Sequence, residues 1–316
     1  MAEILILSAG RRVSLLRAFE KASHEYGLRV SAGDMNPVMS SACQLAAKTI
    51  TLPRNDSIEY HAVLRDYCVQ NDVRLVVPTL DTELARLSKM RDEFAAFGCT
   101  IAVSEPDLIA ICRDKRETAT HFEKFGLRSP ALFDPNALQF PVLVKPYDGS
   151  LSAGISILRS PEEVTPDIVA NPKNIFCAYL EPRDFEEFTC DAYFNSNGDI
   201  RCVVPRLRVE VRGGEVSKGR TAKNDIVPFL FSQLAQLPGA RGCMTIQIMR
   251  HKETGALFLI EINPRFGGGY PLTARCGAAY HQWLIDEYVN GIDVPVFDDW
   301  TDNLTMLRYD AEVFVG

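Results

Sequence analysis

The amino-acid sequence predicts an α/β protein that starts with a doubly wound parallel sheet and continues as an α+β region built on antiparallel strands. Three observations point to this fold class. Short apolar runs alternate with helical patterns over the first third of the chain. Strands separated by short Gly- and Asn-containing turns dominate the rest. The chain of 316 residues is long enough for about two domains, each with its own core.

The parallel sheet is expected to begin with the apolar run 4–7, which ends in the turn Ser8-Ala9-Gly10. A helix is expected over 13–26, because apolar residues recur there at helical spacing and Gly27 stops the pattern. The unit then recurs, and strands that alternate with helices in this way are parallel. We place this first domain at residues 1–105. Further strands are expected at 28–32, 48–52, 74–77 and 100–103, and further helices at 57–70 and 82–97.

The second region starts with a helical pattern over 106–125 and then becomes rich in strands. The turns at 195–198 and at Gly213-Gly214 join consecutive strands as hairpins, which makes this sheet antiparallel. Strands are expected at 140–146, 154–158, 175–180, 187–194, 200–211, 215–221, 244–250 and 257–263, and helices at 225–237 and 279–290.

The composition excludes several classes of protein. The chain has 34 Lys and Arg against 41 Asp and Glu, a net charge of −7, and no basic tract, so nucleic acid is not an expected partner. No apolar run is long enough to cross a membrane, and the first residues lack the basic flank of a secretory signal. The nine cysteines form no CxxC pair and the five histidines no HExxH spacing, which argues against a zinc site or a disulfide framework. We therefore expect a cytoplasmic protein with no membrane partner.

A strand that ends in Lys145 leads into a loop of small residues that includes Gly149, Ser150 and Gly154. Such a loop can lay backbone N–H groups over phosphates while the lysine ammonium neutralises their charge. The GxxxxGK[ST] order of a P-loop is absent, and a second strand follows in place of a helix. The alternative is a flexible turn beside an exposed lysine.

The strand 257–263 places Glu261 and Asn263 on one face, because side chains two residues apart in a strand point the same way. A carboxylate beside an amide oxygen suits Mg²⁺, and Gln247 on the preceding strand could supply a third oxygen. The alternative is a solvated strand face. Three adjacent glycines follow, among them Gly268, and they indicate close approach of the backbone to a ligand or to another segment.

A third candidate site is the strand edge at Tyr179, Leu180 and Glu181, whose backbone groups could bind a purine. Glu187 follows a few residues later and could accept hydrogen bonds from ribose hydroxyls. An ordinary acidic connection between strands is the alternative.

Taken together and in this order, these segments resemble the ATP-grasp superfamily over residues 106–270. The segments 78–83, 209–219 and 262–271 look most like its carbamoyl-phosphate-synthase-like group of carboxylate-amine ligases. The resemblance implies a two-part ATP-grasp α+β fold after a pre-ATP-grasp domain, with a small subdomain and lid at 106–175 and a large subdomain with the metal site at 176–316. It further implies nucleotide binding by Lys115, Lys145, Gly149, Ser150, Gly154, Tyr179, Leu180, Glu181 and Glu187, metal binding by Gln247, Glu261 and Asn263, and a catalytic Arg265.

The resemblance implies an ATP- and Mg²⁺-dependent ligase, with Mn²⁺ as the alternative ion, that activates a carboxylate as an acyl phosphate for attack by an amine or another nucleophile. Lys218 and Arg220 share one strand face and could clamp the carboxylate or the acyl phosphate, or they form a basic face in solvent. The rival function is a nucleotide-binding module without turnover, serving as a regulatory or scaffold subunit. A nicotinamide enzyme is disfavoured because the GxGxxG fingerprint is missing after the first strand. A homodimer is the expected assembly.

The acid is expected to bind against the first domain, since ligands of parallel sheets bind at the carboxyl ends of the strands. Arg11 follows the first strand and could pair with a carboxylate, and Thr79 follows a later one. Asp81 or Glu83 could hold a substrate ammonium, as in an amino acid. The alternative is that Arg11 caps its turn and Asp81 begins a helix.

Overall fold

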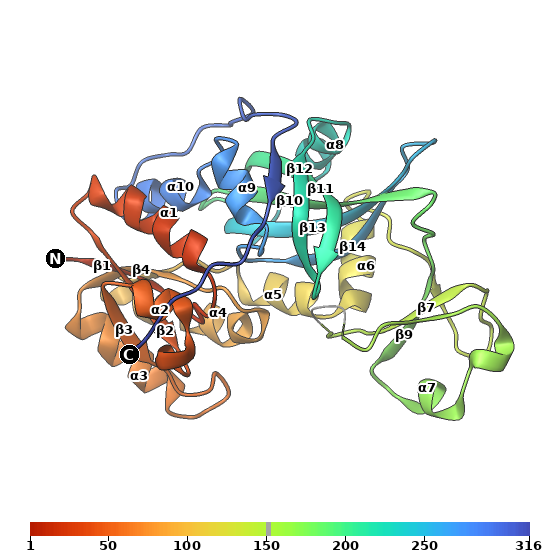
Figure 1. Ribbon diagram of the computed structural model, residues 1–316, viewed down its shortest axis with the longest axis horizontal. Coiled ribbons are helices and arrows are strands. Elements are labelled where there is room, and N and C mark those ends of the chain that lie inside the picture. Colours follow the sequence, from red (N-terminus) through yellow and green to blue (C-terminus); the bar gives the residue numbers. More distant parts are fainter. Residues whose placement is uncertain (150–152) are drawn as a thin grey trace.

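The computed structural model describes residues 1–149 and 153–316 and confirms the predicted fold class, with one parallel and two antiparallel sheets (Figure 1). The parallel sheet has the strand order β3-β2-β1-β4-β5. Because this order changes direction between β1 and β4, the carboxyl ends of these two strands flank a crevice. The strands are β1 (Glu3–Ile6), β2 (Arg29–Asp34), β3 (Lys48–Thr51), β4 (Val73–Val77) and β5 (Thr100–Ile101).

Helices cover both faces of the parallel sheet, as its alternating buried residues require. Ile4 and Ile6 of β1 belong to a core with α1 and α2, whereas Leu5 and Leu7 belong to a core with α3 and α4 on the other face. The helical segments are α1 (Val13–His24), η1 (Pro37–Met39), α2 (Ser41–Leu45), α3 (Tyr60–Gln70) and α4 (Asp81–Ala96).

A small antiparallel sheet has the order β6-β9-β7-β8 and a core of its own, centred on Val142, Val144 and Phe176. Figure 1 shows β7 and β9 away from the first domain, on the other side of the large sheet. The expected boundary at residue 175 falls inside β9, and the domain limits stay predictions. The elements are β6 (Leu132–Phe133), β7 (Val142–Pro146), β8 (Ser156–Leu158), η2 (Pro161–Glu163), α7 (Pro166–Ala170) and β9 (Asn174–Ala178).

The large antiparallel sheet has the order β14-β13-β10-β11-β12-β15. One face is buried under α5, α6 and α8, and the other under α9 and α10. Its strands are β10 (Phe185–Phe194), β11 (Ile200–Arg212), β12 (Glu215–Thr221), β13 (Gly242–His251), β14 (Leu257–Asn263) and β15 (Thr305–Leu307), and its helices are α5 (Pro106–Arg113), α6 (Lys115–Glu123), α8 (Ile226–Gln233), α9 (Tyr270–Arg275) and α10 (Tyr280–Tyr288).

One core joins the first domain to the large sheet. Phe19 of α1 lies edge-on to Phe266 and to His281, with ring centroids 6.0 Å apart in each case. Leu284 of α10 and Trp300 belong to the same buried cluster. The first domain and the large sheet therefore form one packed unit, against which the small sheet has a separate core.

Two differences from the predicted elements have clear physical reasons. The helix expected over 106–125 is two helices, because Asp114 is extended and its side chain accepts a hydrogen bond from the Arg116 N–H, as an N-cap of α6. The short elements α2, β6, α7, α9 and β15 were not predicted, since they have too few residues for a periodic pattern. Within the described residues, no helix has the length and apolar character needed to span a membrane.

Candidate functional site

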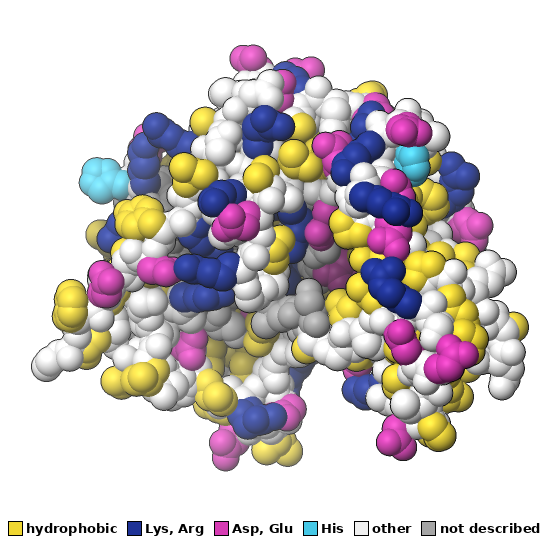
Figure 2. Space-filling view, turned by 45° about the vertical axis from the view of Figure 1, so that its right-hand side comes forward, with side chains coloured by type: hydrophobic (Ala, Val, Ile, Leu, Met, Phe, Trp, Pro, Cys, Tyr) yellow, Lys and Arg dark blue, Asp and Glu magenta, His cyan; other side chains and the backbone are white. Residues whose placement is uncertain are grey.

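A cleft of about 560 Å³ lies where the three sheets meet. Figure 2 shows a hollow in the middle of this face, with basic and acidic side chains along its walls. The first domain contributes Arg12, Thr79, Leu80 and Asp81, from the carboxyl ends of β1 and β4. The small sheet and its loop contribute Leu143, Lys145, Pro146, Gly149, Ala153 and Ile155, and the large sheet contributes among others Glu187, Arg206, Arg208, Glu215, Gln247, Glu261, Asn263 and Arg265.

The register of β13 and β14 brings the predicted metal ligands together. Gln247 is paired directly with Glu261, and Thr245 with Asn263, so the three polar side chains share one face. Glu261 Oε1 accepts hydrogen bonds from Gln247 Nε2 at 2.7 Å and from Asn263 Nδ2 at 3.0 Å. One carboxylate and two amides thus form a compact polar group in the cleft, which we call the candidate metal-ligand group.

This group fits Mg²⁺ better than a transition metal. Magnesium takes oxygen ligands, often only one or two from protein, and completes its shell with water and substrate phosphates. No cluster of three or more His, Cys, Asp or Glu side chains that could hold a metal occurs in the described part of the chain. A single carboxylate supported by amides is consistent with an ion that is bound jointly with a phosphate ligand.

Two lysines stand beside this group. Lys115 is the first residue of α6, and its Nζ lies 3.4 Å from Glu261 Oε2 and donates to the Gly149 carbonyl at 2.7 Å. Lys145 lies on β7 and is buried, and this burial lowers the pKa of its ammonium, with the Lys115 charge acting in the same direction. A polyanion bound between these lysines would offset the cost of holding both charges there.

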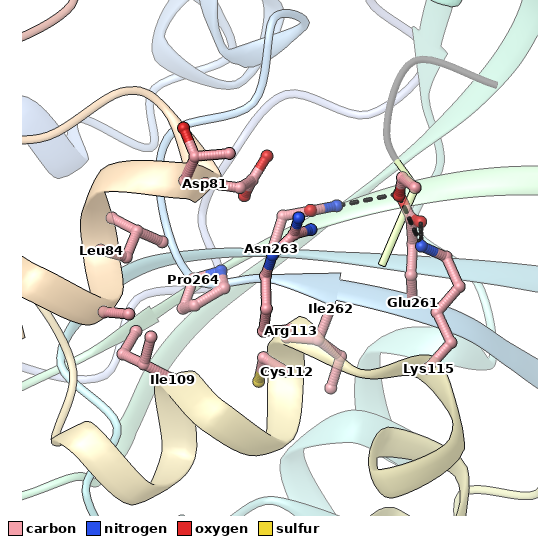
Figure 3. Close-up of a pocket in the computed structure, with 13 residues that line it drawn as sticks. Asp81, Leu84, Ile109, Cys112, Arg113, Lys115, Glu261, Ile262, Asn263 and Pro264 are labelled. Carbon is pink, nitrogen blue, oxygen red and sulfur yellow. Dashed lines mark hydrogen bonds and ion pairs between the residues drawn. The ribbon is translucent and has the colours of Figure 1, made fainter. Parts of the chain in front are cut away.

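A side pocket of about 80 Å³ opens beside the candidate metal-ligand group, between α4, α5 and the end of β14 (Figure 3). Figure 3 shows Lys115 and Asn263 directed toward Glu261, with α4 residues on the opposite wall. The floor is apolar and includes Leu84, Ile109 and Cys112. The pocket shares Asp81, Lys115, Gly149, Glu261 and Asn263 with the main cleft and is an extension of the same site.

Glu187 lines the cleft, as expected, with its Oε1 3.0 Å from Nε of Arg208. Burial raises the pKa of its carboxyl group, although the Arg208 charge opposes the shift. Tyr179, Leu180 and Glu181 follow β9 and are not among the described residues that line the cleft. Glu181 pairs instead with Arg159 at 3.3 Å. Their role as a purine-binding edge stays a prediction.

Arg265 lies at the junction of the large sheet and the first domain. Its Nη2 donates to Asp81 Oδ2 at 2.5 Å, and its Nη1 donates to the Phe266 carbonyl at 3.1 Å. Asp81 therefore forms its ion pair with Arg265 of the protein itself, which does not fit the expected role of binding a substrate ammonium. Thr79 lines the cleft, but its hydroxyl donates toward the carbonyls of Leu7 and Ser8 and so ties two strand ends together.

Four further expected site residues, Glu83, Arg11, Lys218 and Arg220, are not among the residues that line the cleft. The Glu83 carboxylate is buried and accepts hydrogen bonds from the Ser8 hydroxyl and the N–H groups of Thr79 and Leu80, which makes it structural. The Arg11 side chain is 74% exposed and pairs with Glu215 at 3.1 Å. Lys218 and Arg220 are exposed on β12, which is the position expected for a basic strand face in solvent.

Only some of the glycines expected to lie close to a ligand line the cleft. Gly149, Gly267, Gly268 and Gly269 line the cleft. Gly154 is described, with φ +73°, but does not line it, and Ser150 lies outside the described residues. A side chain at Gly269 would collide with Arg206, since its Cβ would lie 1.8 Å from Nη1.

Sequence reasoning missed Arg12, Arg206, Arg208 and Glu215. Arg206 is buried and forms a 2.8 Å ion pair with buried Asp191. The pair joins the adjacent strands β10 and β11, and a single sequence does not show which residues of two strands lie side by side. Arg12 was one residue away from the predicted Arg11, and only the helix start at Val13 decides which of the two faces the cleft.

A doubly wound domain followed by a small and a large antiparallel sheet, with lysines and a Glu-x-Asn-x-Arg strand in the cleft between them, defines the ATP-grasp class of proteins. Two family models agree. The PylC-like N-terminal domain matches residues 4–102, and the model described as ATP-grasp in the biosynthetic pathway with Ter operon matches residues 171–310. The chain therefore contains a PylC-like N-terminal domain and an ATP-grasp domain.

Solved structures share this fold. The biotin carboxylase domain of 2-oxoglutarate carboxylase from Hydrogenobacter thermophilus, a dimer in complex with MgADP, ADP and bicarbonate, has a TM-score of 0.73 and 16% identity over 96% of this chain and 73% of that chain. N5-carboxyaminoimidazole synthetase from Staphylococcus aureus, complexed with ADP, has a TM-score of 0.70 and 15% identity over 93% and 78%. L-amino acid ligase from Bacillus licheniformis has a TM-score of 0.69 and 16% identity over 92% and 74%. The comparison with curated protein sequences gave no match.

Proposed function

We propose that this protein is an ATP- and Mg²⁺-dependent ligase that activates a carboxylate as an acyl phosphate and transfers the acyl group to an amine or another nucleophile. The observation that supports it best is the group formed by Glu261, Gln247 and Asn263 with Lys115, at the end of a cleft that is closed on its other side by the first domain. A nucleotide and a second substrate can share such a cleft. The names of the structural neighbours, an amino acid ligase and two proteins whose structures are complexes with ADP, agree with this class of reaction.

The nucleotide would lie between the small and large sheets. Lys115 and Lys145 would bind its phosphates, and Glu187 would accept hydrogen bonds from the ribose. Leu143, Ile155 and Ile260 offer apolar surface for the base. Tyr179 to Glu181 would contribute to this end if the small sheet moves relative to the large one, which its separate core permits.

Glu261, Asn263 and Gln247 would hold Mg²⁺, which supplies charge neutralisation and alignment for the phosphates when it is bound. Mn²⁺ has the same ligand preferences and would substitute. The chain's own contribution is position: Asp81 holds the Arg265 guanidinium in place, and Lys115 forms an ion pair with Glu261 that orients its carboxylate.

In the reaction, a carboxylate oxygen attacks the γ-phosphorus and the bond to the β-phosphate oxygen breaks, so that ADP leaves with that electron pair. The amine then attacks the acyl carbon, phosphate leaves, and the amine loses a proton. The charge that develops on the transferring group would be stabilised by Lys115, which lies 3.4 Å from Glu261, and by Arg265, which lines the same cleft.

The rival function, an ATP-binding module without turnover, is distinguished by a trapping experiment. The protein is incubated with MgATP and a panel of carboxylic and amino acids, with hydroxylamine as a general nucleophile, and both ADP and acyl hydroxamate are measured. The proposal expects ADP and hydroxamate in equal amounts for at least one acid. Binding of MgATP without acid-dependent ADP or hydroxamate would favour the module. A homodimer, as in the biotin carboxylase neighbour, stays part of the proposal.

A further inference from the structure

One arginine of the cleft has no carboxylate partner. Of the arginines that line the cleft, Arg12 alone has no Asp or Glu oxygen within 4.0 Å among the described residues. The other three each form an ion pair: Arg206 with Asp191 at 2.8 Å, Arg208 with Glu187 at 3.0 Å and Arg265 with Asp81 at 2.5 Å.

Arg12 stands next to Arg265 at the first-domain end of the cleft. Arg12 Nη1 donates to the Phe266 carbonyl at 3.3 Å, and Arg265 Nη1 donates to the same oxygen at 3.1 Å. The other Arg12 donor bond, from Nη2 to the Thr79 carbonyl, is also 3.3 Å long. Two guanidinium groups thus share one neutral acceptor, and the bonds of Arg12 are at the long end of the hydrogen-bond range.

The local charge balance is positive. Arg11, Arg12, Arg265 and Arg308 surround two carboxylates, those of Asp81 and Glu215. Asp81 is engaged by Arg265, and Glu215 is engaged by Arg11 at 3.1 Å and by Arg308 at 2.7 Å. Four cations against two anions leave two positive charges at this end.

This arrangement is costly without a ligand. Burial, together with the neighbouring Arg265 charge, lowers the pKa of Arg12 to about 10. The Nε of Arg265 is also buried and has no hydrogen-bond partner within the described structure. A bound oxyanion would remove both penalties, because it would pair with the charge and accept from free donors.

We propose that Arg12, together with Arg265, binds an oxyanion of the acyl substrate at the first-domain end of the cleft. That the anion belongs to the acyl substrate rests on the proposed function. A carboxylate and the phosphoryl group of an acyl phosphate share the required chemistry, two or more oxygens that carry negative charge. A structural role for Arg12, as a tie between the Thr79 and Phe266 carbonyls, is the competing explanation.

The test measures anion binding directly and needs no turnover. Mg²⁺ and the β,γ-imido analogue of ATP fill the nucleotide end, and sodium acetate or sodium sulfate is then added at an ionic strength held constant with sodium chloride. Thermal unfolding reports binding, since a ligand of the folded state raises the melting temperature. The variants are Arg12→Gln and Arg12→Lys, with Arg17→Gln as the matched control, because Arg17 is an exposed arginine of α1.

The proposal expects acetate or sulfate to stabilise the wild-type protein and the Arg17→Gln control equally. Arg12→Gln should need about tenfold more anion for the same shift, and should bind the ATP analogue as before. Arg12→Lys should lie between them, because lysine retains the charge but not the two-pronged geometry. Stronger stabilisation by acetate assigns the subsite to the carboxylate, and by sulfate to the phosphoryl group.

Absence of any anion effect in the wild-type protein, or an unchanged effect in Arg12→Gln, would overturn the proposal. If Arg12→Gln does not fold, Arg12→Lys is the deciding variant. An anion affinity of Arg12→Lys equal to that of the wild-type protein would also overturn the proposal. A variant that loses the ATP analogue together with the anion would place Arg12 at the nucleotide. The trapping experiment tests the proposed function separately. If anions stabilise the protein but it forms neither ADP nor hydroxamate with any acid, the proposed function fails and the anion site remains.

Discussion

Asp81, the first residue of α4, forms a 2.5 Å ion pair with Arg265, which follows β14 and lies 184 positions later in the chain. The pair is one of the contacts between the parallel domain and the segment that follows β14. Asn263, two residues before Arg265, hydrogen-bonds to Glu261 at 3.0 Å. The first domain therefore holds in place an arginine that lies two residues after the end of β14.

Asp81→Asn should reduce turnover by about 10- to 100-fold while leaving MgATP binding intact, because Arg265 would lose the partner that orients it and small misplacements cost this much. The measurement is ADP formation with a saturating acid, together with a nucleotide titration. Asp56→Asn removes an aspartate that pairs with Arg54 on the surface and serves as the control. Equal turnover in the two variants would show that the Asp81–Arg265 contact has no part in the reaction.

Glu261→Gln should keep the fold and abolish ADP formation, because the amide fills the same volume but lacks the charge that holds Mg²⁺. MgATP should stabilise the wild-type protein by about 2.7 kcal/mol at one hundred times the Kd, and Glu261→Gln should lose the Mg²⁺-dependent part of this shift. Glu253→Gln, in the exposed turn between β13 and β14, is the matched control. Undiminished ADP formation in Glu261→Gln would remove this residue from the site.

Glu83→Leu should destabilise the protein by about 3 kcal/mol without a specific effect on substrate affinity, because two backbone N–H groups and the Ser8 hydroxyl would lose their acceptor. Glu83→Gln should cost less, since its amide oxygen can still accept from both N–H groups. Denaturant unfolding measures both values. A normal stability combined with a raised KM for the acid would restore Glu83 to the substrate site.

The Glu83 carboxyl group also predicts a pH dependence of stability. Burial raises its pKa above 4.5 in the folded protein. As pH rises through 4.5 the unfolded chain ionises first, so the free energy of unfolding falls until pH passes the raised pKa of the folded state. Glu83→Gln should lose this fall, which denaturant titrations at several pH values would detect.

His281 predicts a loss of stability in acid. Burial lowers its pKa from 6.5 to about 4, with the Lys21 charge adding to the shift. Between these values the unfolded chain binds a proton that the folded chain does not, so the free energy of unfolding should fall by about 3 kcal/mol as pH drops from 6.5 to 4. His281→Gln should flatten this dependence, and His24→Gln, at an exposed position at the end of α1, serves as the control. The same slope in both variants would contradict the assignment.

Periodicity was enough to predict the classes of the sheets and which polar side chains of β14 lie together. The alternation of apolar runs with helices gave the parallel domain, and the period of two in 257–263 placed Glu261 and Asn263 together, as the register with Gln247 confirms. A period shows which residues share a face but not which face meets the cleft. Lys218 and Arg220 do share a face, and it is the outer one.

The sequence did not show which of two neighbouring side chains at a turn faces the cleft. Arg11 and Arg12 are adjacent and chemically identical, and their opposite exposure depends on where α1 begins. Asp81 and Glu83 both follow β4, and either could have capped the helix or faced the cleft. The structure turns Glu83 inward onto the N–H groups of Thr79 and Leu80, which leaves Asp81 for Arg265. Such choices are made by tertiary contacts that a local pattern does not contain.

The glycine loop after β14 gives the last prediction. Gly269 is the N-cap residue of α9 and has φ −87°, so an alanine there has an acceptable backbone, but its Cβ would lie 1.8 Å from Nη1 of Arg206. Arg206 cannot yield easily, because it is buried and forms a 2.8 Å ion pair with Asp191, which also accepts a 2.6 Å hydrogen bond from Thr273.

Gly269→Ala should therefore destabilise the protein by about 2 kcal/mol or more, because the added methyl group overpacks a site whose neighbour is held in place. Gly268→Ala is the matched comparison. Its Cβ would meet the Glu215 carboxylate at 3.1 Å, and that side chain is half-buried and can shift by a few tenths of an ångström. Chemical unfolding of the two variants measures the difference. Equal stability would mean that Arg206 moves freely, and then the buried pair with Asp191 does not hold the loop against the cleft.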